Sequence, residues 1–269
     1  MLRFDLNLSI TMPGLPWRER FDSAARLGFD AVELWWPDDE HRPTIPRLAA
    51  DAGVRVVHCN LDGGDLAAGE RGLLNDPARL PAFRAGVPGA LELAATLGCT
   101  RLHALVGRLL PGEPREAQLA RAHEAVAWLC AQAAPLGITI LVEALNSWET
   151  PGYLLASTAE ALAFIAAVGA PNLAYQYDVY HMQRMEGNIA ATIAAHAGRM
   201  GHIQVADSPG RGQPGTGELR FPFIFEAIAA SGYAGYIGVE CAPRGPLAEA
   251  LAWLPPDRRG PVAPGQIRL

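Results

Sequence analysis

The sequence contains few cysteines and no long apolar run. Its four cysteines, Cys59, Cys99, Cys130 and Cys241, are far apart, and no two of them form a CxxC pair. This spacing argues against a structural zinc ribbon and offers no disulfide framework, so we expect reduced, mostly buried thiols. No uninterrupted apolar stretch reaches the roughly 18 residues that a membrane-spanning helix needs, so we expect no membrane partner.

The sequence also lacks any block of basic residues. Its 269 residues include 22 Lys and Arg against 28 Asp and Glu, which gives a formal net charge of -6. A nucleic-acid-binding surface needs a basic patch, so this charge argues against a nucleic-acid partner and favours a small molecule. Residues 1–14 enter a strand-like alternation directly, without the basic and apolar regions of a secretory signal, and this start predicts a cytoplasmic protein.

Short apolar strands alternate with helical segments along the chain. The expected strands are residues 4–10, 31–36, 55–60, 101–107, 139–145, 173–181, 202–207 and 236–241, and the expected helices are residues 16–27, 43–52, 77–97, 113–134, 158–168, 188–197, 221–230 and 247–254. This alternation predicts a parallel sheet, and eight strands suit a closed (β/α)8 TIM barrel. An open doubly wound sheet is the rival fold, but neither GxGxxG nor GxxxxGK[ST] follows any strand. We therefore expect a single barrel over residues 1–254 and a Pro/Gly-rich C-terminal extension over 255–269.

Four oxygen-bearing side chains are expected where successive strands end. Glu143 and Glu240 are charges within the apolar segments TILVEAL and YIGVECAP, Asp178 has the same position in AYQYDVYH, and Gln204 ends the strand between them. A buried charge costs several kcal/mol, on the order of 5, unless it is paired or bound to a metal. An oxygen-only set of this kind suits Mg²⁺ or Mn²⁺ better than zinc. The alternative interpretation is that each carboxylate makes its own buried ion pair.

Histidines and a Gly/Pro-rich loop accompany these carboxylates. His58, His103, His181 and His202 also fall near strand ends, where they could help to bind several zinc ions, as in barrel endonucleases that act on damaged DNA. The acidic net charge argues against that function, so we interpret the histidines as neighbours of the metal or as substrate-binding groups. Asp207 ends the expected seventh strand, where a metal ion or polar substrate could satisfy several closely spaced polar side chains at once.

Several segments resemble the hydroxypyruvate isomerase family of xylose-isomerase-like barrels. They are GFDAVELWWP, DLAAGERG, VEALN, YDVYHMQ, HIQVADSPGRGQPGTGE and YIGVE, within residues 4–243, and HIQVADSPGRGQPGTGE is the most specific. The resemblance implies one divalent metal held by Glu143, Asp178, Gln204 and Glu240, with the two glutamates also serving as proton donor and acceptor. It implies interconversion of hydroxypyruvate and tartronate semialdehyde through an enediolate. Related barrels often pair, so the resemblance also implies a homodimer.

A sugar-acid substrate brings a carboxylate that needs a cation. Arg71 is the first candidate, followed by Arg108 and Arg211. The expected substrate-binding residues are Arg71, His181, His202, Asp207, Arg211 and His58. The sequence departs from the family at Cys241 and Ala242, where an aromatic residue and a Lys are usual, and this departure leaves the substrate open. The alternatives are a 2-oxo-tetronate isomerase or ketose 3-epimerase with the same site, and a non-catalytic barrel that binds a sugar acid.

Overall fold

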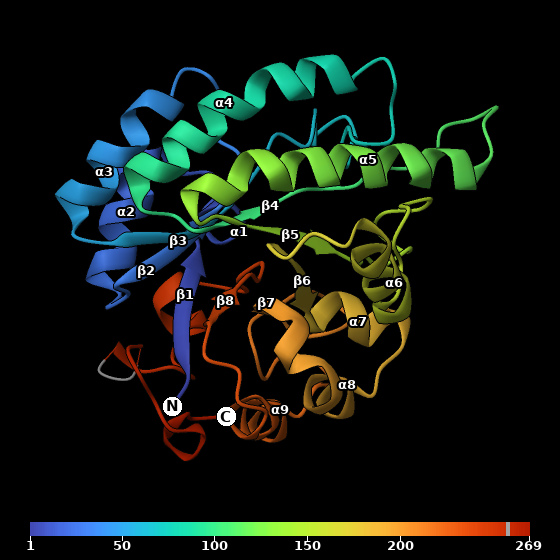
Figure 1. Cartoon of the computed structure of the whole chain (residues 1–269). Helices are drawn as coiled ribbons and strands as arrows, with labels where there is room; N and C mark the ends of the chain where they lie inside the picture. The colour runs from blue at the N-terminus through green and yellow to red at the C-terminus, as the bar shows by residue number, and fades with distance from the viewer. Residues whose placement is uncertain (257–258) are drawn as a thin grey trace.

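Eight parallel strands pair in chain order and close into a barrel (Figure 1). The structure is a computed structural model, and it describes residues 1–256 and 259–269. The strands are β1 (Arg3–Asn7), β2 (Ala31–Leu34), β3 (Arg55–Asn60), β4 (Arg101–His103), β5 (Thr139–Glu143), β6 (Leu173–Asp178), β7 (Met200–Val205) and β8 (Tyr236–Val239). The predicted TIM barrel is therefore confirmed.

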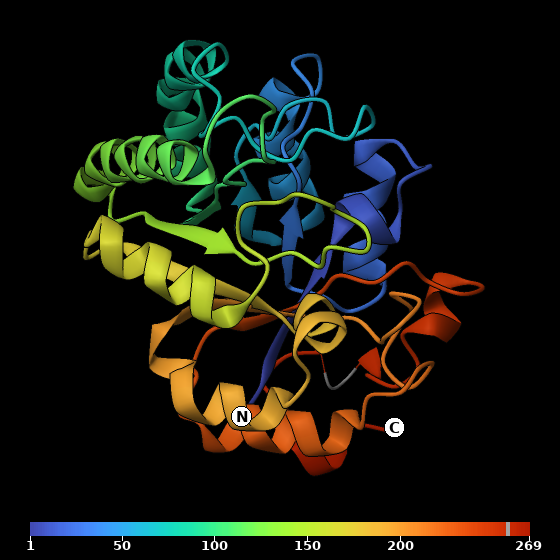
Figure 2. The ribbon, with the colours of Figure 1, turned by 90° about the vertical axis from the view of Figure 1, so that its right-hand side faces the viewer.

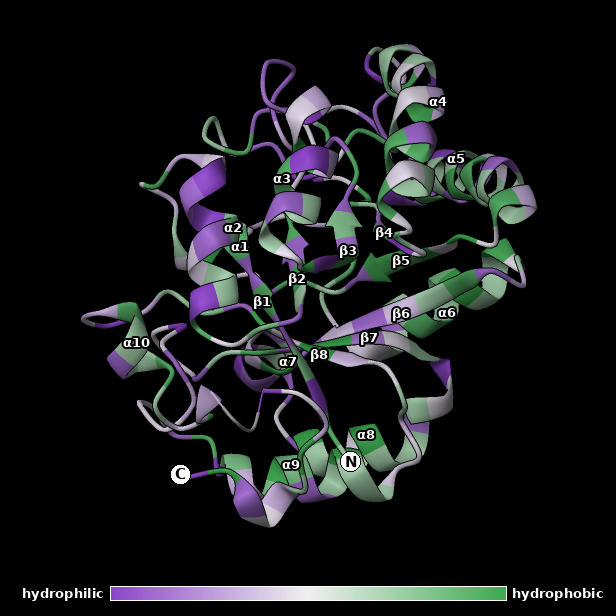
Figure 3. Ribbon diagram, turned by 90° about the vertical axis from the view of Figure 1, so that its left-hand side faces the viewer, coloured by the Kyte–Doolittle hydropathy of each residue, from purple (hydrophilic) through white to green (hydrophobic). Residues whose placement is uncertain are grey.

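Helices surround the barrel. They are α1 (Leu8–Thr11), α2 (Trp17–Arg26), α3 (Ile45–Ala52), α4 (Leu80–Leu97), α5 (Arg115–Ala133), α6 (Thr158–Val168), α7 (Val179–Met185), α8 (Ile189–His196), α9 (Phe221–Ala230) and α10 (Leu247–Ala250). Figure 3 shows hydrophobic colouring along much of α8 and mixed colouring along α2. Outward-facing strand residues pack against these helices, as where Phe4 meets Phe225 edge-on with ring centroids 5.4 Å apart. None of the described helices has the length and apolarity to cross a membrane.

Seven of the eight strands end two to four residues earlier than the sequence pattern predicts, and at two of these ends a polar side chain caps a short helix. The expected strand over residues 4–10 stops at Asn7, whose Oδ1 accepts hydrogen bonds from two backbone N–H groups of α1 at 2.9 and 3.1 Å. The expected strand over 173–181 stops at Asp178, whose Oδ1 accepts from the N–H of Tyr180 at 2.7 Å. Each cap satisfies N–H groups that a helix start leaves unpaired, and each turns the chain at the rim of the barrel.

The register of the sheet brings polar residues of neighbouring strands side by side near the carboxyl ends. The paired residues are Asn7 with Glu33, Glu143 with Gln176, and Asp178 with Gln204. Figure 2 shows the loop between β5 and α6, in yellow-green, crossing in front of the strands. Active sites of TIM barrels lie at this end because the loops that follow the strands gather there.

The C-terminal segment returns to the first strand, and both chain ends lie close together at the bottom of Figure 1. Leu2 and Val262 exchange backbone hydrogen bonds of 2.7 and 2.8 Å. The buried guanidinium of Arg259 donates to the carbonyl oxygens of Leu254 and Leu251 at 2.9 and 3.3 Å. The described part of the tail therefore packs on the barrel, and the boundary after residue 254 stays a prediction.

Candidate active site

A cavity of about 420 Å³ brings together five of the predicted site residues. Its lining residues are Trp35, Asn60, Leu66, Ala67, Arg71, His103, Leu105, Glu143, Leu145, Glu149, Thr150, Gln176, His181, Arg211 and Glu240. Apolar walls with a few converging charged groups are typical of a small-molecule site. The cavity therefore has the composition of a small-molecule site.

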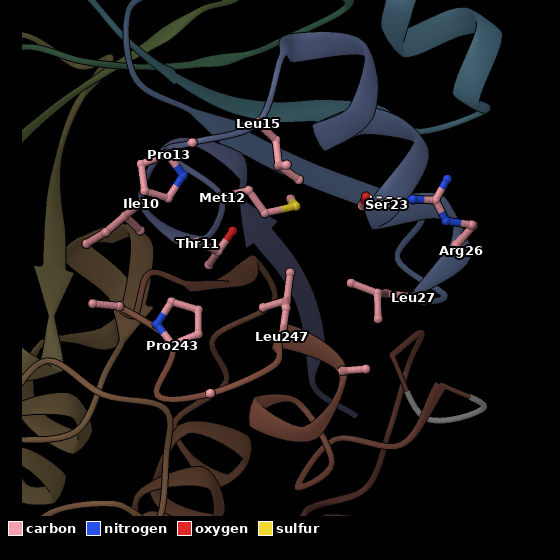
Figure 4. A pocket seen from close by; sticks show the side chains of 14 residues that line it. Ile10, Thr11, Met12, Pro13, Leu15, Ser23, Arg26, Leu27, Pro243 and Leu247 are labelled. Carbon is pink, nitrogen blue, oxygen red and sulfur yellow. Dashed lines mark hydrogen bonds between the residues drawn. The ribbon is translucent and has the colours of Figure 1, made fainter.

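A larger cavity, of about 690 Å³, has a different composition (Figure 4). It lies between the segment that joins α1 to α2 and the chain after β8, and its walls include Met12, Leu27 and Leu247. Arg26 is the one charged residue among its described lining residues. Without a carboxylate or an imidazole, this cavity offers no acid/base chemistry.

Glu240, at the end of β8, is held by donors on both carboxylate oxygens. Its Oε1 accepts hydrogen bonds from Asn7 Nδ2 and Trp35 Nε1, both at 2.9 Å. Its Oε2 accepts from Arg211 Nη2 at 2.6 Å. Burial raises the pKa of Glu240 to about 7, although the guanidinium of Arg211 and the N–H of Trp35 lower it. Glu240 can therefore exchange a proton near neutral pH.

Glu143 ends β5 and is almost completely buried. Its Oε2 accepts a hydrogen bond from Gln176 Nε2 at 3.2 Å, and no described residue pairs with its Oε1. Burial, together with the negative charges of Asp178 and Glu240, raises the pKa of Glu143 well above its usual range. The two glutamates thus face one cavity from different strands and both favour protonation more than exposed carboxyl groups do.

Asp178 and His181 lie together at the start of α7. Asp178 Oδ2 has no hydrogen-bond partner among the described residues, and burial raises the pKa of this carboxyl to about 6. His181 Nδ1 accepts from the backbone N–H of Asn146 at 3.0 Å, and burial lowers the pKa of the ring well below its usual range. The ring is therefore neutral with its proton on Nε2, which lies 3.6 Å from Asp178 Oδ2. His181 is arranged as a hydrogen-bond donor.

Gln204 belongs to a layer of hydrogen bonds beneath the cavity. Its Nε2 donates to Glu33 Oε1 at 2.8 Å, and its Oε1 accepts from Gln176 Nε2 at 2.8 Å. Glu33 Oε1 also accepts from Asn7 Nδ2 at 2.9 Å. Together with the bonds from Asn7 to Glu240 and from Gln176 to Glu143, these contacts form one continuous network that joins the two glutamates. Such a network fixes the orientation of both carboxylates.

The predicted ligand set fits a hard divalent cation. Glu143 Oε1 and Asp178 Oδ2 are buried oxygens that lack partners among the described residues, and Glu240 Oε2 faces a cation already. Oxygen donors with shared negative charge suit Mg²⁺ or Mn²⁺. Ligand atoms of Glu143, Asp178 and His181 all lie within 4.8 Å of one another, but the proton on His181 Nε2 opposes direct ligation by that ring. Gln204 Oε1 retains one lone pair beyond its bond to Gln176.

Two arginines bring positive charge into the cavity. Arg211 lies in the loop after β7, and its Nη2 is 2.6 Å from Glu240 Oε2 and 3.6 Å from Asp178 Oδ2. Among the described residues, Arg71 donates only to carbonyl oxygens, those of Leu66 and Glu70, at 2.9 and 2.7 Å. Arg108, by contrast, does not line this cavity and donates to backbone carbonyls outside it.

Three predicted substrate-binding residues do not line the cavity. His58 and His202 stack inside the barrel with ring centroids 4.6 Å apart, and His202 Nε2 lies 2.6 Å from Glu33 Oε2. Asp207 turns toward its own loop, where its carboxylate accepts from the backbone N–H groups of Ser208, Gly215, Gly217 and Leu219. The sequence predicts that these three side chains meet the substrate. In the structure each already has another partner in the fold, and their role in substrate binding stays a prediction.

Glu33, Asn7 and Gln176 are site-supporting residues that the sequence interpretation missed. Glu33 is fully buried in the segment AVEL, and it gives the same signal that identified Glu143, a charge in an apolar strand. Despite burial, hydrogen bonds and the charge of His202 lower the pKa of Glu33 to about 2. The two amides carry no charge, so only their contacts in the folded chain reveal them.

The family of this chain follows from its sequence similarity and agrees with this geometry. A family model described as "Xylose isomerase-like TIM barrel" matches residues 21–256. The chain belongs to this family. Its relatives include the hydroxypyruvate isomerase of Escherichia coli (strain K12), which is 38% identical over 258 residues that cover 96% of this chain and 100% of the relative.

Other members of the xylose isomerase-like TIM barrel family carry different names. The 2-oxo-tetronate isomerase of Cupriavidus necator is 39% identical over 258 residues, covering 95% of this chain and 98% of the relative. A crystal structure described as an AP endonuclease of family 2 from Brucella melitensis has a TM-score of 0.91 and 38% identity, covering 96% of this chain and 100% of that chain. The resemblance to the hydroxypyruvate isomerase family is confirmed, and so is the prediction of an isomerase.

Proposed function

We propose that the chain is a divalent-metal-dependent isomerase that interconverts hydroxypyruvate and tartronate semialdehyde. The observation that carries this proposal is the pair of buried glutamates, Glu143 and Glu240, which face one cavity that also contains two arginines. The name of the Escherichia coli relative supports the choice of substrate. We further propose Glu143, Asp178, Gln204 and Glu240 as the metal-holding residues.

The reaction moves a carbonyl group between adjacent carbons without net oxidation. A proton leaves C3 of hydroxypyruvate and another leaves its hydroxyl group, while protons arrive at C2 and at the former carbonyl oxygen. The enediolate between these steps carries negative charge on oxygen. A bound divalent cation would supply positive charge against that oxygen. The enzyme must then provide one group that takes a carbon-bound proton and one that returns it.

Glu143 and Glu240 are suited to this exchange of protons. Burial raises the pKa of both carboxyl groups, that of Glu240 to about 7 and that of Glu143 well above its usual range, so each holds a proton more readily than an exposed glutamate does. One glutamate acts as base at C3 and the other as acid at C2, with the roles reversed in the opposite direction. The hydrogen-bonded network beneath them keeps the two carboxyl groups directed into the cavity.

The remaining cavity residues are suited to binding the substrate. Arg71, whose guanidinium has no carboxylate partner among the described residues, is a candidate to bind the substrate carboxylate. The Nε2–H of His181 can donate to a substrate oxygen beside the metal-holding residues. Leu66 and Leu105 form an apolar wall that limits access of water to the reacting carbons.

An endonuclease function, which the description of the similar Brucella structure suggests, fits this chain less well. The formal net charge is -6, whereas binding to DNA phosphates depends on a surface rich in Lys and Arg. The two arginines of the cavity face carboxylates and carbonyls, as would suit one small anion. We also propose that the protein works in the cytoplasm, and a homodimer stays a prediction.

The test is turnover of hydroxypyruvate by the wild type and by two isosteric variants, Glu143→Gln and Glu240→Gln. Each substitution keeps the size of the side chain but removes the proton-exchanging group, so we expect kcat to fall by at least about 100-fold while circular dichroism is unchanged. Retention of wild-type kcat by either folded variant would refute the proposal. If the wild type converts a four-carbon oxo acid more efficiently than hydroxypyruvate, 2-oxo-tetronate isomerase is the better description of its activity.

A ketose 3-epimerase is separated from this function by its product, because an epimerase leaves the carbonyl group in place. NMR of a free ketose incubated with the enzyme would reveal a 3-epimer directly. A non-catalytic sugar-acid-binding barrel would show binding of the acid with no product from any substrate. Each outcome is distinct from the conversion of hydroxypyruvate that we expect.

A further inference from the structure

We propose that Arg211 and the divalent cation compete for the same carboxylate oxygens, so that metal binding releases the Arg211 guanidinium into the cavity as an anion-binding group. This inference rests on the proposed function, because it concerns the same metal-holding residues. It adds an order to the binding events. The cation binds first, and a substrate whose carboxylate is held by Arg71 then meets a second guanidinium, that of Arg211, which was previously paired within the protein.

The hydrogen bonds of Glu240 make the competition direct. Its Oε1 already accepts from Asn7 Nδ2 and Trp35 Nε1, both at 2.9 Å, which leaves Oε2 as the oxygen available to a cation. Arg211 Nη2 lies 2.6 Å from that Oε2. A cation bound to the remaining lone pair of Oε2 with Arg211 unmoved would lie roughly 4 Å from the guanidinium nitrogen, so repulsion between the two positive charges favours withdrawal of the guanidinium.

Asp178 shows the same arrangement. Its Oδ1 accepts from the N–H of Tyr180 at 2.7 Å, so Oδ2 is the free oxygen. Arg211 Nη2 is 3.6 Å from Oδ2, which is within salt-bridge range but beyond hydrogen-bond distance. The guanidinium therefore occupies the position where positive charge is needed between Asp178 and Glu240, without satisfying both carboxylates.

A second set of partners lies beside the first on the cavity side. Arg211 Nη1 is 3.9 Å from Glu149 Oε2, and the guanidinium lies over the ring of Tyr180 at 5.3 Å. Tyr180 in turn donates from its hydroxyl group to Glu149. Glu149 lines the cavity, and its side chain is 42% exposed, so movement toward it brings the guanidinium to the open part of the site.

The backbone of Arg211 is fixed, so the movement belongs to the side chain. Its carbonyl oxygen accepts from the N–H of Ala242 at 2.8 Å, and its φ of 52° lies in the left-handed region, which a non-glycine residue adopts only when its surroundings hold it there. Rotation about the side-chain bonds can exchange Glu240 for Glu149 without disturbing this anchored backbone.

Arg71 provides a matched control in the same cavity. Its guanidinium is a cavity cation like that of Arg211, but it donates to carbonyl oxygens and has no carboxylate partner among the described residues. If cavity cations weakened metal binding only through their general electrostatic field, loss of Arg71 would raise the Mn²⁺ affinity as loss of Arg211 does. If Arg211 competes directly with the cation, only loss of Arg211 raises the Mn²⁺ affinity.

The experiment measures Mn²⁺ affinity by isothermal titration calorimetry on metal-stripped full-length protein, with no substrate present. We expect Arg211→Met to bind Mn²⁺ at least about tenfold more tightly than the wild type, because no ion pair has to be broken. Arg71→Met should stay within about twofold. Glu149→Gln, which removes the alternative partner, should weaken Mn²⁺ binding by about threefold or more.

Equal shifts for Arg211→Met and Arg71→Met, or unchanged or weaker binding by Arg211→Met, would overturn the inference. Glu149 lies at the cavity rim, so Glu149→Gln keeps the test decisive if Arg211→Met does not fold. Unchanged Mn²⁺ affinity in Glu149→Gln would also contradict the exchange of partners. If the measured Mn²⁺ affinities of the variants contradict these expectations while the wild type still converts hydroxypyruvate in a metal-dependent manner, the proposed competition is wrong and the proposed function stands. If the wild type binds no Mn²⁺ at all, both are wrong.

Discussion

The indole Nε1 of Trp35 donates a hydrogen bond to Glu240 Oε1 over 2.9 Å, which ties β2 to the glutamate at the end of β8. We expect Trp35→Phe to lower kcat by roughly 10- to 100-fold, because a hydrogen bond to a charged group contributes about 1.5–3 kcal/mol. The Trp35 N–H lowers the pKa of Glu240, which is about 7, so its loss should raise that pKa and move the corresponding limb of the pH profile to higher pH.

Trp36→Phe is the matched control for this substitution. Trp36 is next in the chain, but it packs under the guanidinium of Arg42, 4.3 Å from the ring centroid, and does not line the cavity that contains Glu240. Trp36→Phe should therefore leave the pH profile of kcat unchanged. Identical pH profiles for Trp35→Phe and the wild type would show that the indole N–H does not act on Glu240.

Asp5 is predicted to destabilise the folded protein at neutral pH. Its carboxylate is fully buried, and neither oxygen finds a hydrogen-bond partner among the described residues. Burial and the nearby charge of Glu33 raise its pKa well above the value of 3.8 expected for an unfolded chain. The folded state therefore retains a proton that the unfolded state has released, and this costs stability at every pH above the unfolded pKa.

Asp5→Asn should consequently raise the melting temperature at pH 8, and the gain should vanish as the pH falls below about 4, where Asp5 is protonated in both states. Thermal unfolding followed by circular dichroism at several pH values is the measurement. A lower melting temperature for Asp5→Asn at pH 8 would mean that favourable contacts of the carboxylate outweigh the cost of burying it.

Asp207→Asn should have the opposite effect. Four backbone N–H groups donate to this buried carboxylate, at 2.8 to 3.1 Å, and they hold the loop that carries Arg211. Replacing one oxygen by an NH₂ group places donors against donors and should cost about 2–3 kcal/mol of unfolding free energy at pH 7. Urea denaturation gives this value, and a change smaller than about 0.5 kcal/mol would exclude a structural role for the carboxylate.

Metal binding should release protons, and more of them at pH 6 than at pH 8. Burial raises the pKa of Asp178 to about 6 from 3.8, and that of Glu240 to about 7 from 4.5. Both folded values lie above the unfolded ones, so metal-free protein should lose stability as the pH rises from about 4 to about 7. A cation displaces the bound protons and removes this cost.

Calorimetric titration with Mn²⁺ in buffers of different ionisation enthalpy measures the number of protons released. The rise in melting temperature caused by Mn²⁺ should also be larger at pH 8 than at pH 5, because protons no longer compete for the carboxylates. A proton release that does not change between pH 6 and pH 8 would contradict the raised pKa values of these two groups.

Three of the site carboxylates could be found from the sequence, because a charge at the end of an apolar strand is costly to bury unless it has a partner. Glu143, Asp178 and Glu240 give this signal, and the barrel topology places them at one end. Glu33 gives the same signal within AVEL, but it does not belong to the metal-ligand set that the family resemblance implies, and the sequence interpretation therefore missed it.

The depth of a side chain inside the barrel was harder to predict. His202 and Gln204 both point inward, but two residues along a strand correspond to about 6.6 Å, so His202 lies one layer below Gln204. His58 is likewise beneath Asn60, which lines the cavity. The direction of Asp207 depended on the conformation of a Gly/Pro-rich loop, and no strand or helix period determines that conformation.

NMR of hydroxypyruvate in D₂O with metal-stripped enzyme, before and after addition of Mg²⁺ or Mn²⁺, tests the proposed isomerase most directly. We expect tartronate semialdehyde to form only after the cation is added, with deuterium incorporated at C2 from the glutamate that exchanges with solvent. Conversion that is unaffected by stripping or adding the cation, or no conversion at all by folded and metal-loaded protein, would contradict it.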